Sequence, residues 1–283
     1  MKKITIIFIA YIICHSTVLG QQIDNRLLLE QMVEAIEKAE RLQFRFVQKE
    51  RVRNGWNEAE VEIKYQVKSQ KIYIKCVEPN AGAELLLVEG KYDGYVYVNP
   101  NGFPFINLKL NQYGFLLLGN QKHHPIESTG YGLFYDVAKD YLTQTHTPLE
   151  DLLAFKGMVN FDGKTCYHLE LKDPSYRFVE YTIQKGENIL NIARRLHIGD
   201  YIILEKNPKI SDYFDVKTGQ KIQIPTLYSP KAVLYLDASS FLPLMLEMSD
   251  DKGIYEHYEF LDLKINPSFK ENEFSDDFLE YGF

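Results

Sequence analysis

The chain has 283 residues, of which 45% are hydrophobic and 25% charged, a composition typical of a globular protein and not of a disordered one. Its formal net charge of −7 argues against general nucleic-acid binding, which requires a basic surface to neutralise phosphates. The 20 tyrosines and 17 phenylalanines favour broad sheet faces that are half buried, since aromatic residues are enriched in strands.

The first 20 residues are predicted to be an export signal. Lys2 and Lys3 precede an apolar run over 4–13, and Gly20 closes a cleavage site before Gln21. Such a short run does not serve as a permanent membrane span. We therefore expect cleavage after Gly20, a periplasmic or otherwise exported protein, and no transmembrane segment after signal removal.

Beyond the signal, the chain begins with one helix and continues with strands. Apolar residues at helical spacing predict an amphipathic helix over 25–39, which needs a sheet to cover. Asn54-Gly55 separates two alternating runs, 42–46 and 61–67, and is a strong hairpin signal. Further strands are expected over 71–77, 84–88, 94–98, 157–161, 165–171, 232–236, 242–248 and 254–265, and a second helix over 130–142. Tight turns between successive strands predict an antiparallel sheet.

Residues 181–225 interrupt this series with a unit of their own. A short strand over 181–183 is followed by Asn188, a good N-cap, and by apolar residues at helical spacing. A second helix over 200–205 is expected to end at Asn207-Pro208, because a residue before proline avoids the helical region. A closing strand over 220–224 completes a βααβ order.

The same unit resembles the LysM module, a glycan-binding domain of cell-wall and envelope proteins. The matching residues are Tyr181-Thr182-Ile183, Lys185 to Ile189, Ile192-Ala193, Asn207 to Ile210 and Gly219 to Pro225. The resemblance implies binding of peptidoglycan or another glycan that contains N-acetylglucosamine; a spacer without a ligand is the alternative. Contacts are expected at two loops, through Gly186, Glu187, Asn188 and Ile189 in one and Asn207, Pro208, Lys209 and Ile210 in the other. Ile189 and Ile210 are expected to supply the apolar contact.

The remainder of the chain resembles the outer-membrane lipoprotein carriers LolA and LolB, and more closely an exported domain-of-unknown-function family of that type. The resemblance is carried by 78–86, 124–127, 132–133, 161–167, 236–237, 242–243, 258–260 and 263–266. It implies an α+β fold, a curved antiparallel sheet forming an unclosed half-barrel covered by helices. The apolar concave face is then expected to hold lipid or lipoprotein acyl chains, unless aromatic side chains fill it as ordinary core.

This resemblance divides the chain into three parts: a signal peptide over 1–20, a discontinuous LolA-like domain over 22–178 plus 228–283, and a LysM-like insertion over 179–227. Because acid and base residues meet through folding, catalysis cannot be read from spacing alone. The sequence nevertheless lacks the serine-elbow, zinc-helix and phosphate-loop motifs. We therefore expect a non-enzymatic envelope protein without cofactor or metal. The alternative is an envelope scaffold that contacts proteins only.

A few histidines and cysteines need separate interpretation. His123-His124 invites a metal-site interpretation, but adjacent residues rarely face one ion, so a structural loop is favoured. Cys166 two residues before His168 would need a lowered pKa to act as a nucleophile. Whether Cys76 and Cys166 form a disulfide stays open, since an exported protein enters a space where disulfides persist.

Overall fold

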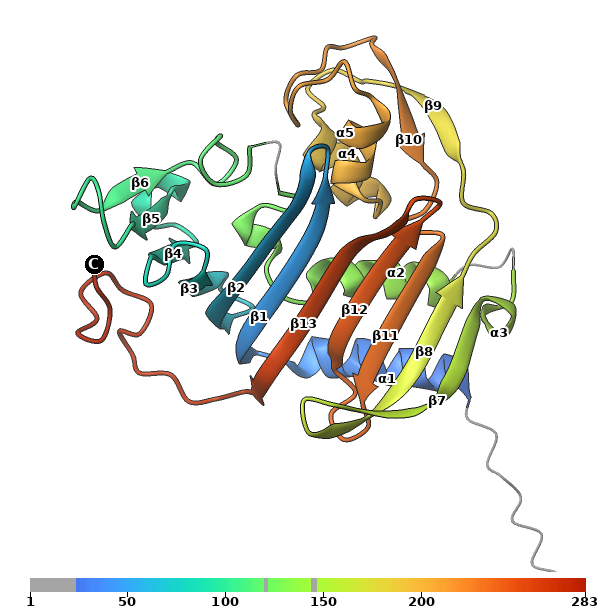
Figure 1. The fold of residues 1–283 in the computed structure, drawn as a ribbon, viewed down its shortest axis with the longest axis horizontal. Coiled ribbons are helices and arrows are strands. Elements are labelled where there is room, and N and C mark those ends of the chain that lie inside the picture. The colour runs from blue at the N-terminus through green and yellow to red at the C-terminus, as the bar shows by residue number, and fades with distance from the viewer. Residues whose placement is uncertain (1–23, 120–121, 144–146) are drawn as a thin grey trace, which may run out of the picture.

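The computed structural model describes residues 24–119, 122–143 and 147–283, so the predicted signal peptide lies outside the described residues. One large antiparallel sheet of 11 strands dominates the fold, and two helices lie across one of its faces (Figure 1). Its strands are β1 (Arg41–Val52), β2 (Gly55–Gln66), β3 (Lys71–Glu78), β4 (Glu84–Val88), β5 (Val96–Asn99), β6 (Leu108–Leu110), β7 (Leu153–Phe161), β8 (Lys164–Lys172), β11 (Lys231–Asp237), β12 (Pro243–Asp250) and β13 (Gly253–Ile265).

The order of the strands in the sheet is β6-β5-β4-β3-β2-β1-β13-β12-β11-β8-β7. The predicted hairpin around Asn54-Gly55 is present, with β1 and β2 paired from Arg41↔Gln66 to Val52↔Gly55. The last strand, β13, pairs with the first, from Leu42↔Ile265 to Glu50↔Glu256. This pairing joins the two halves of the chain into one sheet, which stays open between its edge strands β6 and β7.

The helices α1 (Asn25–Lys38) and α2 (Gly132–Thr143) cover the sheet, and the short helix α3 (Leu149–Leu152) precedes β7. Two 3-10 turns, Tyr92–Gly94 and Ile126–Ser128, lie in the connections. Asp24 caps α1 by accepting a hydrogen bond from the Leu27 amide. Leu28, Leu29, Met32 and Val33 of α1 then lie in the core, as the helical periodicity predicts.

The insertion has the predicted βααβ order. It consists of β9 (Phe178–Thr182), α4 (Ile189–Leu196), α5 (Asp200–Lys206) and β10 (Lys221–Pro225). β9 and β10 pair with each other, from Phe178↔Pro225 to Thr182↔Lys221, and form a separate two-stranded sheet. Figure 1 shows this unit at one end of the large sheet, beside the tip of the β1–β2 hairpin.

The predicted fold class, an unclosed antiparallel sheet covered by helices with a βααβ insertion, is confirmed. Two small elements were not predicted: β6, with three residues, and α3, with four. β7 also begins at Leu153, four residues before the predicted start at Gly157, because pairing with β8 extends it. In the part of the chain that the structure describes, no helix is both long enough and apolar enough to span a membrane.

Candidate binding sites

The two loops that the sequence assigns to glycan contact lie next to each other. The first connects β9 to α4, and the second connects α5 to β10. The amide of Ile189 donates a hydrogen bond of 2.9 Å to the Tyr213 carbonyl, which joins the two loops. Gly186, Pro208 and Lys209 are exposed on their surface. These loops therefore offer backbone and side-chain groups to a ligand from two sides.

Several of the predicted contact residues also have structural roles. Asn188 caps α4 and forms a capping box with Asn191, in which each side-chain oxygen accepts a hydrogen bond of 2.9 Å from the backbone amide of the other residue. Asn207 donates to the Ile203 and Gln223 carbonyls, both at 2.7 Å. These two side chains hold the ends of the helices in place, so a ligand meets them mainly through the loop shape that they impose.

Glu187 is held by three donors. Its carboxylate accepts hydrogen bonds from the Gln184 amide, the Tyr181 hydroxyl and the Arg195 guanidinium. Partial burial opposes ionisation, but these three donors lower the pKa of Glu187 below its ordinary value. The side chain is therefore an anion whose position is fixed at the edge of the first loop.

The expectation that Ile189 and Ile210 contact glycan through their side chains does not fit the structure. Ile189 is 0% and Ile210 2% exposed, and both belong to the hydrophobic core of the insertion. Ile189 is the first residue of α4, and Ile210 lies in the loop after α5. Both side chains point inward because the two short helices are held together by their shared apolar core. Phe214, which the sequence analysis did not single out, is 47% exposed in the second loop and offers apolar surface there instead.

A buried polar cluster joins the insertion to the large sheet. At its centre, His123 Nδ1 lies 2.6 Å from Glu256 Oε1, and His123 Nε2 lies 2.8 Å from the Arg51 carbonyl oxygen. The His123 ring also stacks on Tyr201 of α5, with 4.3 Å between ring centroids. Both ring nitrogens face atoms that only accept hydrogen bonds, so His123 is the charged imidazolium.

His124 makes the connection from the sheet to α5. Its Nδ1 lies 3.3 Å from Asp200 Oδ2, and its Nε2 lies 3.4 Å from Glu256 Oε1. Burial lowers the pKa of His124, but Asp200 and Glu256 overcome it and raise the pKa well above 6.5. The two histidines in turn lower the pKa of Glu256 to about 2, against the effect of its burial.

Glu50 closes the cluster on the side of the β1–β2 hairpin. Its carboxylate accepts hydrogen bonds from the Tyr258 hydroxyl at 3.0 Å, the Asn57 amide group at 3.0 Å and the His123 backbone amide at 3.2 Å. The imidazole nitrogens of His123 and His124 are thus occupied by protein acceptors. Among the described residues, no group of three or more His, Cys, Asp or Glu could hold a metal ion.

Two arginines of the β1–β2 hairpin add further contacts to the insertion. Arg51 forms ion pairs with Asp250 at 2.6 Å and with Glu205 of α5 at 3.2 Å. Arg53 donates to the Leu204 carbonyl at 2.6 Å and to the Ile210 carbonyl at 3.0 Å. Arg53 therefore binds the end of α5 and the start of the α5–β10 loop directly.

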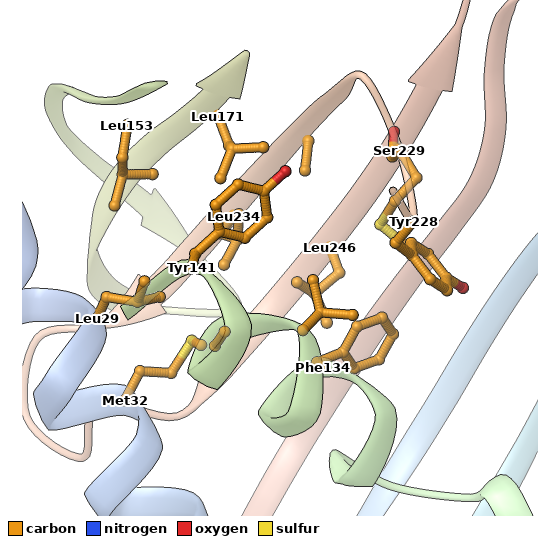
Figure 2. Close-up of a pocket in the computed structure, with 14 residues that line it drawn as sticks. Leu29, Met32, Phe134, Tyr141, Leu153, Leu171, Tyr228, Ser229, Leu234 and Leu246 are labelled. Atoms are coloured by element: carbon orange, nitrogen blue, oxygen red, sulfur yellow. The ribbon is translucent and has the colours of Figure 1, made fainter. Parts of the chain in front are cut away.

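Under the helices, the concave face of the sheet contains a small apolar cavity of about 70 Å³. Figure 2 shows Leu29 and Met32 of α1, Phe134 and Tyr141 of α2, and Leu234 and Leu246 of the sheet around it. The Tyr141 hydroxyl has no hydrogen-bond partner among the described residues. Burial and the nearby Asp173 raise its pKa, so it stays a neutral donor.

A second and larger cavity of about 330 Å³ lies beside it on the same face. Its body is lined mainly by apolar side chains, among them Phe44, Phe46, Val61, Ile63, Ile74 and Leu117. Polar residues, among them Glu50, Asn57, Lys122 and His124, also belong to the lining. Phe134 lines both cavities, so its ring lies between them.

Of the cysteines in the part of the chain that the structure describes, neither Cys76 nor Cys166 has the environment of a nucleophile, since burial raises the pKa of both thiols. Cys76 and Cys166 are both free, which answers the question of a disulfide for this structure. Burial, as the main cause, and the nearby Asp237 raise the pKa of the Cys166 thiol to about 11. The thiolate that nucleophilic attack requires is therefore scarce at neutral pH.

Comparison with known families gives two matches. Residues 39–196 match the family described as "Protein of unknown function (DUF1571)", which is more than half of the chain. The chain belongs to the DUF1571 family. Residues 181–225 match the LysM domain, with the bounds that the sequence predicts. No curated protein matches this DUF1571 member.

Several solved structures are similar in their overall arrangement. The Pseudomonas aeruginosa MucA/MucB complex contains a chain that is 15% identical, with a TM-score of 0.41, over 89% of this chain and 61% of that one. The Mycobacterium tuberculosis lipoprotein LppX is 11% identical with a TM-score of 0.40, over 87% and 99% of the two chains. A LolA superfamily protein from Nitrosomonas europaea is 11% identical with a TM-score of 0.33, over 90% and 99%.

The DUF1571 chain thus spans about three fifths of the length of the MucB chain that it matches. Likenesses at these scores carry no information on ligands.

Proposed function

We propose that this protein is an exported, non-enzymatic binding protein of the cell envelope. Its LysM module holds a glycan that contains N-acetylglucosamine, and its curved sheet holds a lipid or an acyl chain. The observation that carries the proposal is the meeting of the two LysM loops, which the Ile189–Tyr213 hydrogen bond joins and on which Gly186, Pro208 and Lys209 are exposed.

Glycan binding is supported by the groups that these loops present. Gly186 and Pro208-Lys209 are exposed backbone and side-chain positions, and Phe214 adds an aromatic surface. Aromatic side chains offer large contact area together with a defined orientation. A sugar ring with an acetamido group needs this combination of apolar surface and hydrogen-bonding groups.

Titration of the mature protein with a soluble N-acetylglucosamine oligomer tests the glycan part. We expect saturable binding that Phe214→Ser weakens roughly tenfold, as for the loss of one good aromatic contact. Leu196→Ser is the matched control, because Leu196 is 37% exposed on the same module at the other end of α4. Equal binding by wild type and Phe214→Ser would contradict this assignment, and absence of binding would favour the spacer interpretation.

Lipid binding is supported by the larger cavity. Its volume of about 330 Å³ falls in the range of small-molecule sites, roughly 300–1,000 Å³. A lining that combines apolar side chains with a few polar groups suits a ligand with an aliphatic body and a polar end. Phe46 and Val61 are among the apolar residues of the lining, and Glu50 and His124 are among the polar ones.

A fluorescent fatty-acid probe tests the lipid part separately. We expect saturable binding by the mature protein and weaker binding by Val61→Trp, whose larger side chain fills the cavity. Val233→Trp is a control at a partly buried strand position that does not line the cavity. Binding that does not saturate, or that Val61→Trp leaves unchanged, would mean that the concave face is ordinary core.

A second candidate function, a scaffold for another envelope protein, is favoured by one surface feature. Phe103, Phe105 and Phe115 are 87%, 81% and 85% exposed on the two loops that flank β6, the edge strand of the sheet. Exposed apolar patches of this kind mark interaction sites. Loss of a co-purifying partner from Phe103→Ser/Phe105→Ser, with probe binding intact, would support the scaffold.

A further inference from the structure

The largest cavity described here lies where the insertion meets the sheet domain. It has a volume of about 670 Å³ and is lined by three separate parts of the chain. Ile202, Glu205, Lys206 and Pro208 come from the insertion, Tyr176, Arg177 and Phe178 from the connection before β9, and Pro230 to Lys231 and Asp250 to Lys252 from the sheet. We call this cavity the junction cleft.

The junction cleft is continuous with the second LysM loop. Pro208 belongs to that loop and also lines the cleft. Lys206, which lines the cleft as well, is the last residue of α5 and directly precedes the loop. A ligand that follows the loop past Pro208 therefore enters the cleft. This makes the cleft a candidate extension of the glycan site rather than an independent pocket.

The unpaired charges in the junction cleft are mostly positive. Glu205 is neutralised by Arg51 and Lys252, and Asp250 by Arg51. In contrast, within the described part of the chain, no carboxylate forms an ion pair with Arg177, Lys206 or Lys231. Asp251 is the remaining acidic side chain of the lining. Three cations without a carboxylate partner among the described residues, in one cleft of a chain with net charge −7, favour an anionic ligand.

An aromatic wall lies beside these cations. The rings of Tyr176 and Phe178 meet edge to face with 5.6 Å between centroids, and Lys206 Nζ lies 4.4 Å from the Phe178 ring centroid. Aromatic faces contact sugar or peptide carbons, and lysine and arginine bind carboxylates. The lining thus combines the two kinds of group that a carboxylated glycan needs.

We infer that the junction cleft is a second subsite of this chain, which binds the carboxylates of peptide substituents on the bound glycan. The inference rests on the proposed glycan function. It adds that N-acetylglucosamine rings contact the two LysM loops, while the carboxylates of the attached peptide reach Lys206, Lys231 and Arg177.

Two soluble ligands separate the inference from the function on which it rests. The mature protein is titrated with an N-acetylglucosamine oligomer and with a disaccharide–peptide fragment of peptidoglycan. We expect the peptide-bearing ligand to bind roughly 3- to 30-fold more tightly, the range for two partly exposed ion pairs. The difference should shrink as salt is added, because the contacts are solvent-accessible.

The variant Lys206→Ser/Lys231→Ser should abolish this difference and leave the affinity for the plain oligomer unchanged. Lys172→Ser is the matched control, since Lys172 is the cross-strand partner of Lys231 but pairs with Glu170 and does not line the cleft. Thermal melts check that each variant folds.

The outcomes are distinct. Equal affinity of wild type for both ligands, or a difference that the double variant retains, overturns the role of the cleft while the glycan function stands. Binding of the peptide-bearing ligand alone, lost in the double variant, supports the cleft and overturns glycan contact at the LysM loops. Binding of neither ligand overturns both.

Discussion

His124 Nδ1 lies 3.3 Å from Asp200 Oδ2, and this pair links the large sheet to the LysM module through a buried contact. His124 lies in the connection between β6 and α2, and Asp200 begins α5. Around them, His123, Glu256 and Glu50 are each at most 3% exposed. Besides the two chain connections, buried and mutually paired charged groups therefore attach the module to the sheet.

The first prediction concerns Asp200. Replacing it with asparagine removes the negative charge opposite His124 and keeps the size of the side chain. Breaking a buried pair costs about 3–5 kcal/mol. Since Glu256 still faces His124, we expect a loss of about 3 kcal/mol in the free energy of unfolding, measured by urea denaturation. Glu180→Gln is the control, because its ion pair with Lys221 is exposed and should contribute below about 1 kcal/mol. Equal effects of the two variants would contradict a special role for Asp200.

The second prediction concerns alkaline pH. The folded state raises the pKa of both His123 and His124 above 6.5. A raised histidine pKa gives stability that is complete below the unfolded value and disappears as pH rises through the folded value. We therefore expect the melting temperature to fall as pH rises from 6.5 into the alkaline range. In His123→Gln/His124→Gln the fall should be much smaller, although the variant is less stable throughout. A flat wild-type profile over this range would argue against charged histidines.

The third prediction concerns acid. The pKa of Glu256 is lowered to about 2, from 4.5. A lowered carboxyl pKa gives stability that is present above the unfolded value and lost as pH falls through the folded one. Acid unfolding of the wild type should therefore include a loss between 4.5 and about 2 that is absent in Glu256→Gln. Denaturant melts at a series of pH values measure both curves. Parallel curves for the two proteins would show that Glu256 does not titrate in this window.

The local pattern of the sequence determined much of this structure in advance. Helical spacing predicted α1, and Asn54-Gly55 predicted the β1–β2 hairpin. The pairing of β1 with β13 was not predictable, because the partners are more than 200 residues apart and no turn fixes their register. The same limit applied to His123, whose partner Glu256 is 133 residues away. Sequence could identify a polar loop there but not the cluster that it enters.

In the insertion, the sequence predicted the order of the elements correctly but not which apolar side chains are buried. Its order of elements and its bounds followed from the caps and prolines of a short segment. The sequence analysis assigned Ile189 and Ile210 to glycan contact because they lie in or next to the loops expected to make it, whereas the structure uses both side chains for the core of this small unit. Burial of a particular isoleucine depends on packing that a linear pattern does not contain.

The fourth prediction concerns the division into domains, with 179–227 as an insertion in 22–178 plus 228–283. The ends of the insertion are adjacent, since Phe178 pairs with Pro225, so a short Gly-Ser linker can replace it. The sequence alone predicts that the remaining domain keeps a cooperative thermal transition. Removing the insertion also removes the contacts of Asp200 and Tyr201 with the two histidines. We therefore expect the melting temperature to fall by roughly 10 °C. Loss of cooperativity would show that the sheet domain cannot fold without its insertion.

The fifth prediction concerns Phe134, whose ring lies between the two cavities of the concave face. Phe134→Ala removes this ring and should join the small cavity under α1 and α2 to the larger one. If an acyl chain occupies the larger cavity, the joined space accommodates a longer chain. We therefore expect the variant to prefer longer fatty-acid probes than the wild type does, and to lose about 2–4 kcal/mol of stability.

A control for this effect is Phe161→Ala, which removes a ring packed against the same core but lining neither cavity. It should lower stability without changing the preference for chain length, so the two variants separate loss of packing from gain of space. Competition between probes of two chain lengths measures the preference directly. If Phe134→Ala keeps the wild-type preference, the ring is not the barrier between the cavities. If neither protein binds a probe, the concave face is core.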